Sequence, residues 1–131
     1  MPKAIKIDVS GKISEVDDVF KDLEYREMKT HDPWALQVPQ VWKYKKYRLT
    51  MICKGIFEQS DTVNVKASFL YHHLYSSRGY PSGPIVETVW FMNEDREGCT
   101  DMTKEDMDYI LKPTCNLSME KQEVEERERL R

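Results

Sequence analysis

The chain has 131 residues, of which 33% are charged and 40% are hydrophobic, and its formal net charge at pH 7 is −3. This length and composition predict one globular domain whose core needs no disulfide staples. Charge is uneven, with 13 Lys and Arg against 10 Asp and Glu in residues 1–80, and 7 against 13 in residues 81–131. A mildly basic body is therefore followed by an acidic end.

Targeting signals and cysteine usage indicate the compartment. The N-terminal sequence MPKAIKIDVSG lacks the apolar core of a signal peptide, and no segment approaches the length of a membrane span. Cys53, Cys99 and Cys115 are odd in number and widely spaced, which favours free thiols over a disulfide framework. We therefore expect an intracellular or cytoplasmic protein that is not secreted and has no membrane partner.

The N-terminal third predicts a β-hairpin and a helix. Ile5, Ile7 and Val9 alternate with polar residues, Ser10-Gly11 supplies a turn, and residues 12–16 can return as a second strand. Asp17 or Asp18 can then cap a helix that ends before Asp32-Pro33. The apolar face of that helix would consist of Val16, Val19, Phe20 and Leu23.

The segment VWKYKKYRLTMICKG, residues 41–55, follows the predicted loop HDPWALQVPQ and is the clearest strand in the chain. Alternation sends one set of side chains into the core, namely Tyr47, Leu49, Met51 and Cys53. The other set would form a solvated face, namely Lys46, Arg48, Thr50 and Lys54.

The remainder of the chain predicts two strands and two helices. Residues 62–71 and 85–92 are expected to be strands, the second buried on both faces, with a Pro- and Gly-rich loop at 76–84 between them. Residues 93–101 then turn the chain. Thr103 and Asp106 form an acidic variant of the capping box, and the helix that they open has Met107, Ile110 and Leu111 on its apolar side.

The C-terminal segment from Leu117 has high helix propensity, and its Glu123–Arg127 and Glu125–Arg129 pairs have i,i+4 spacing. It contains only four apolar residues, Leu117, Met119, Val124 and Leu130. We therefore expect it to lie on a partner or in solvent.

Together these elements predict an α+β fold with a small, mostly antiparallel sheet, built from an N-terminal hairpin, a helix, three further strands and a short helix. Residues 1–113 would form a single domain, and residues 114–131 a charged helical tail.

No catalytic or metal-binding motif is found. His72 and His73 fall on opposite faces if residues 62–71 form a strand, and no further ligand lies at a zinc spacing. Asn93, Asp95 and Glu97 resemble the start of a calcium loop, but Lys104 stands where the bidentate acid belongs. Cys53 is expected in the core and Cys99 in an acidic loop, and neither place favours a reactive thiolate. We predict no cofactor, no metal and no enzymatic activity.

The basic and aromatic residues near position 45 leave two interpretations open. Cations that track phosphates among exposed aromatic rings are typical of nucleic-acid binding. The same lysines on a strand also suit a solvated face, or an edge protected against pairing. The candidate interaction residues are Trp42, Lys43, Tyr44, Lys45, Lys46 and Arg48, together with Arg78 and Tyr80 of the 76–84 loop.

The order of these segments resembles a family of small proteins of unassigned role in large DNA viruses of algae and amoebae. Trp42, Lys43, Lys45, Tyr47 and Leu49 match its Trp-plus-lysine strand, Thr103 and Glu105 match its helix start, and KAIKIDVSGKISEVD is similar to its N-terminus. The proline run is reduced to Pro81 and Pro84, and Met107 or Asp108 stands in place of an aromatic residue. The resemblance implies a viral origin and a virion or capsid-associated role, and it supplies no catalytic residues.

Three hypotheses follow. The first is a non-catalytic interaction or structural protein, a minor component of a large DNA virus particle, whose partners are other proteins. The second is a nucleic-acid-binding accessory factor that uses the basic residues 43–48. The third is a small enzyme built around His72, His73 and Cys99.

Overall fold

The computed structural model describes residues 4–17, 22, 33–38, 48–54, 60–75, 85–95 and 98–129. Within them, six strands form one sheet in which every pairing is antiparallel, in the order β2-β1-β5-β4-β3, with β6 also paired to β5. The strands are β1 (Ala4–Ile7), β2 (Ile13–Val16), β3 (Pro33–Val38), β4 (Arg48–Lys54), β5 (Val89–Asp95) and β6 (Gly98–Thr100). The predicted α+β fold with an antiparallel sheet is confirmed.

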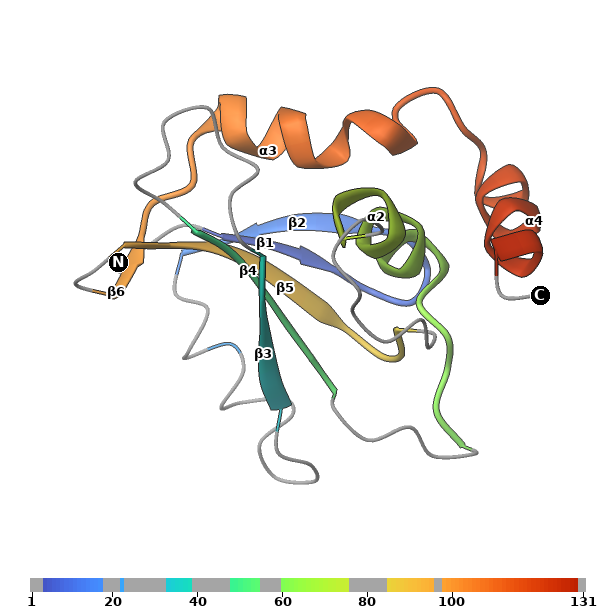
Figure 1. Ribbon diagram of the computed structural model, residues 1–131, viewed down its shortest axis with the longest axis horizontal. Coiled ribbons are helices and arrows are strands. Elements are labelled where there is room, and N and C mark those ends of the chain that lie inside the picture. Colours follow the sequence, from blue (N-terminus) through green and yellow to red (C-terminus); the bar gives the residue numbers. More distant parts are fainter. Residues whose placement is uncertain are drawn as a thin grey trace.

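Helices cover one face of this sheet. They are α2 (Val65–Tyr75), α3 (Lys104–Leu111), the short 3-10 helix η1 (Lys112–Thr114) and α4 (Met119–Arg129). Figure 1 shows α2 and α3 over the sheet, and α4 beyond α2 on the side away from the sheet. The helix predicted after Asp17 falls almost wholly outside the described residues, and Asp22 within it is helical.

The predicted N-terminal hairpin is confirmed, with Ala4 opposite Val16 and Ile7 opposite Ile13. Its turn is organised by Asp8, whose Oδ1 accepts hydrogen bonds from Ser10 N (2.9 Å), Ser10 Oγ and Lys12 N (3.0 Å). Gly11 has φ +86°, a conformation that a residue with a Cβ rarely adopts. Asp8 and Gly11 thus fix the register of the hairpin.

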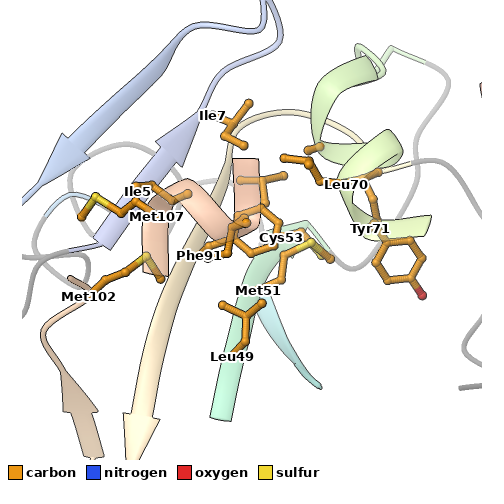
Figure 2. Packing of buried hydrophobic residues seen from close by; sticks show 14 residues of the cluster. Ile5, Ile7, Leu49, Met51, Cys53, Leu70, Tyr71, Phe91, Met102 and Met107 are labelled. Carbon is orange, nitrogen blue, oxygen red and sulfur yellow. The ribbon is translucent and has the colours of Figure 1, made fainter. Parts of the chain in front are cut away.

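The main core lies between the sheet and the helices (Figure 2). Strands β1, β4 and β5 send alternate residues into it, and α2 and α3 close it on the helical side. Its fully buried members include Ile5, Ile7, Leu49, Met51, Phe91, Leu70 and Ile110. The inward prediction for Leu49, Met51 and Cys53 is therefore confirmed.

The opposite face of the sheet is also buried. Ala4, Ile52, Trp90 and Met92 form a second cluster there, and Trp90 Nε1 donates to Asp22 Oδ2 at 2.9 Å. Strand β5 is consequently buried on both faces, as predicted. The prediction of a solvated face on β4 is wrong at Thr50, which is fully buried and donates to Glu94 Oε2 at 2.8 Å. The prediction failed because Thr50 lies on the same buried face as this cluster, opposite Met92 of β5.

Residues 62–71 were predicted as a strand, and this is wrong, because Val65–Tyr75 is helix α2. All five residues from Ala67 to Tyr71 are buried, so the segment lacks the one-sided periodicity that marks a surface helix. A brief extended stretch does precede the helix, since Val63 bridges Val86. Asn64 then begins the helix by accepting a bond from Ala67 N at 3.0 Å.

Residues 33–38 were predicted as part of a loop, and this too is wrong, because they form β3. The strand pairs with β4 from Pro33–Lys54 to Val38–Leu49. Pro33 occupies the first position, where a missing N–H is tolerated.

The segment 93–101 contains more structure than the predicted turn. Strand β5 continues to Asp95, and β6 returns beside it, with Asp95 opposite Gly98. The region that resembled a calcium loop is therefore a hairpin. The predicted capping box of α3 is confirmed, because Asp106 N donates to Thr103 Oγ1 and Thr103 N donates to Asp106 Oδ2. Asn93 Nδ2 also donates to Asp106 Oδ2 at 3.1 Å, which joins α3 to β5.

Candidate functional site

The predicted interaction residues lie almost entirely outside the described part of the chain. These are Trp42, Lys43, Tyr44, Lys45, Lys46, Arg78 and Tyr80, whereas the backbone of Arg48 begins β4. The hypothesis of a basic strand that meets nucleic acid or protein therefore stays a prediction.

His72 and His73 lie on helix α2 and not at the end of a strand, so the prediction that they point to opposite faces of a sheet is wrong. Successive residues on a helix differ by about 100° around its axis. His72 is largely buried, and its Nδ1 lies 2.6 Å from Glu126 Oε2 on α4. His73 is exposed, and its ring centroid lies 4.5 Å from that of Phe69.

Glu126 is the residue of this site that the sequence did not reveal. Its side chain is buried although it belongs to a helix of very polar composition. The Gln122–Glu126 spacing, four residues apart on one helix face, was the available signal. This spacing alone does not identify a buried pair, because the partner of Glu126 lies on α2, 54 residues away in the sequence.

The C-terminal helix α4 therefore packs against α2 of the same chain. The expectation that it lies on a partner or in solvent is wrong for the side that faces α2. That side buries Gln122 and Glu126, which are 1% and 5% exposed. Gln122 Nε2 donates to Leu117 O at 3.0 Å. The pattern of apolar residues does not indicate this contact, because the buried residues are polar.

The His72–Glu126 pair can orient an imidazole, since a carboxylate that accepts from Nδ1 fixes the ring and its tautomer. A nucleophile would be needed beside it for covalent catalysis. Cys99, the thiol proposed from the sequence, lies in β6, and Figure 1 shows β6 at the opposite end of the molecule from α2. Among the described residues, no three His, Cys, Asp or Glu side chains are grouped so that they could hold a metal ion. The pair serves here as a contact between two helices.

The described thiols differ in environment. Cys53 is buried in the main core, and this burial raises the pKa of its thiol from 9.0 to about 11. At neutral pH it is thus protonated and a poor nucleophile. Cys115 is exposed, and its Sγ lies 3.4 Å from Leu111 O.

Helix α4 is the most polar in composition of the described α-helices, and its outward side is exposed. Its exposed members are Glu120, Lys121, Val124, Arg127 and Glu128. Val124 stands near the middle of this face with 53% of its surface exposed, and Arg127 Nη2 lies 2.6 Å from Glu123 Oε1, as the i,i+4 spacing predicted. We call these five residues the α4 outer face.

In the described part of the chain, the fold and the contacts of α4 define a small α+β protein in which α2 and α3 cover one face of an antiparallel sheet and α4 packs against α2. Comparison with family models, with curated proteins and with solved structures found no match. No helix among the described residues has the length and apolar character needed to span a membrane.

Proposed function

We propose that this chain is a non-catalytic interaction protein whose partner is another protein, bound at the α4 outer face. One observation carries the proposal. The domain holds a charged helix in a fixed place by its inward side, while an exposed Val124 lies among charges of both signs on its outward side.

The chemistry of this face suits a protein partner better than a nucleic acid. Glu120 and Glu128 flank Lys121 and Arg127, so the face is not uniformly positive as a phosphate-binding surface would be. Protein–protein contacts combine an apolar centre with a polar rim whose charges select the partner, and Val124 among these charges matches that arrangement on a small scale.

The narrower proposal concerns the setting of that interaction. The resemblance of residues 3–111 to small proteins of large DNA viruses supports a partner in the virion, with this chain as a minor capsid-associated component. It rests on the amino-acid sequence alone.

The test is co-purification from the native source, compared between the unmodified chain and Val124→Glu, followed by binding measurements with the recovered protein. We expect Val124→Glu to reduce the affinity at least about tenfold, because it buries an unpaired charge at the contact. The matched control is Val63→Glu, which alters another exposed valine far from α4 in sequence.

Equal binding by both variants and the unmodified chain would exclude the α4 outer face as the contact. Recovery of nucleic acid without a protein partner would instead favour the accessory-factor hypothesis. Presence of the chain in purified virus particles would support the narrower proposal.

A further inference from the structure

Helix α4 is attached to a fold whose main core does not include it. The buried members of that core, and the partly buried residues packed against it, end at Leu111 in the sequence. What α4 contributes to burial is mainly polar, namely Gln122 and Glu126, and its Val124 points outward. Loss of α4 would therefore leave the main core intact.

The attachment is anchored at both ends of the helix. Near its beginning, a Cβ built on Gly11 would lie 2.8 Å from Met119 Sδ and 3.7 Å from Lys66 Cε, so Met119 and Lys66 both lie beside the β1–β2 turn. Near its end, Glu126 contacts His72. On α2, the contact at His72 lies six residues after Lys66. On α4, the contact at Glu126 lies seven residues after Met119. The two helices therefore run in the same direction.

Two features weaken this attachment. Gln122 Oε1 is buried and has no hydrogen-bond partner among the described residues, and a buried unpaired acceptor disfavours the docked state. In addition, parallel neighbouring helices bring like ends of their dipoles together. The His72–Glu126 contact, with both side chains mostly buried, is the charge-assisted bond that opposes these effects.

We propose that α4 is a releasable strap: it undocks from α2 as a unit while the sheet, α2 and α3 stay folded. The His72–Glu126 contact is the latch. Once undocked, an 11-residue helix is too short to persist in water, so release and unfolding of α4 coincide. Release uncovers the His72 side of α2 and removes the α4 outer face from its fixed position. This inference concerns the chain alone and does not depend on the proposed partner.

The test is native-state hydrogen exchange on the full chain, followed by NMR at increasing, sub-denaturing urea concentrations. We expect amides of α4 to exchange through one shared opening, at least about 100-fold more populated than the opening that exposes β5, with a urea dependence that is measurable but clearly smaller than that of β5 because less surface is exposed. If α4 and β5 exchange with the same free energy and the same urea dependence, α4 is part of the global folding unit and the proposal is wrong.

Substitutions test whether the His72–Glu126 contact holds α4 on α2. Glu126→Gln should raise the population of the α4 opening by about tenfold, because it replaces a charge-assisted bond with a neutral one, and should leave β5 unchanged. Gln122→Leu should lower that population, because it removes the unpaired oxygen. Glu128→Gln, on the exposed side of the same helix, is the matched control and should change neither.

If Glu126→Gln changed the populations of the openings that expose α4 and β5 by the same factor, Glu126 would support the whole fold. The proposal that the His72–Glu126 contact specifically holds α4 would then be wrong. Failure of the Glu126→Gln chain to fold would overturn the latch for the same reason. The urea dependence of the unmodified chain tests the release itself independently of any substitution.

Discussion

Asn64 joins three parts of the fold through one side chain. Its Nδ2 donates to Ile7 O at the end of β1 (3.0 Å) and to Glu87 O (2.9 Å), while its Oδ1 accepts from Ala67 N at the start of α2. The residue is fully buried. Glu87, one of its partners, has φ +60°, so the backbone there is held in an uncommon conformation by the surrounding bonds.

Substitution of this residue should be costly. We expect Asn64→Ala to lower the free energy of unfolding by about 3 kcal/mol, since it removes the helix cap and leaves one buried and one partly buried carbonyl group short of a donor. Urea denaturation measures the change. Asn116→Ala, at an exposed position, is the control and should alter stability by less than about 0.5 kcal/mol. A similar small change for Asn64→Ala would contradict the role given to Asn64.

Asp8 gives the β1–β2 turn a dependence on pH. Hydrogen bonds from the Ser10 side chain, and then from the backbone of Lys12 and Ser10, lower the pKa of its carboxyl below 3.8. A carboxyl whose pKa is lower in the folded state stabilises the fold above the unfolded pKa, and this contribution is lost as pH falls through the folded pKa. Stability should thus fall with Asp8 protonation below about pH 4.

The comparison is with Asp8→Asn, which keeps an acceptor oxygen but does not titrate. We expect the difference in unfolding free energy between the two chains to be constant from pH 5 to 7 and to change as pH falls below about 4. Thermal unfolding at each pH measures it. Parallel pH profiles for the two chains would show that Asp8 does not contribute.

At the scale of elements, the hairpin turn and α4 meet at Gly11. An added Cβ at this position would come within 2.8 Å of Met119 Sδ, and the φ of +86° is unfavourable for any residue with a Cβ. These two costs have different origins. Only the steric one depends on α4.

A double-mutant cycle separates them. Gly11→Ala should destabilise the chain by about 1–2 kcal/mol from the backbone conformation, plus a steric part. In a Met119→Ala background only the backbone part should remain, so the effects of the two substitutions should not be additive. Urea denaturation of the four chains measures the coupling. Strict additivity would mean that Met119 does not rest on the turn.

At the scale of the whole molecule, strands β4 and β5 are buried on both faces, and Cys53 reports on the integrity of the main core. The thiol is 2% exposed, and burial raises its pKa to about 11. A thiol reagent can therefore reach it only when the sheet and its covering helices separate.

We expect a Cys99→Ser chain at pH 8 to react with a chromogenic disulfide reagent in two phases. Exposed Cys115 should react promptly. Cys53 should react at least about 1000-fold more slowly, because its reaction requires global opening of the fold. A Cys115→Ser,Cys99→Ser chain, in which the fast phase should disappear, is the control. Prompt reaction of Cys53 would show that the core opens far more readily than the global fold.

Much of this architecture was predictable from the order of residues. Alternation in residues 5–7 and 49–53, the Ser10-Gly11 turn, and the Thr103–Asp106 capping box are local patterns, and local backbone chemistry enforces them. Helix α4 and its Glu123–Arg127 pair follow from propensity and from i,i+4 spacing in the same way.

Only the tertiary structure decided the rest. Helix α2 is not recognisable from the sequence because burial around most of it removes the one-sided periodicity of a surface helix. Residues 33–38 form a strand because β4 offers an edge with which they pair. Thr50 was buried by a cluster of residues distant in sequence, and the His72–Glu126 contact joins positions 54 residues apart. The sequence by itself determined where local hydrogen bonds close. Contacts between segments distant in the sequence decide which surfaces are covered, and local sequence patterns do not indicate these contacts.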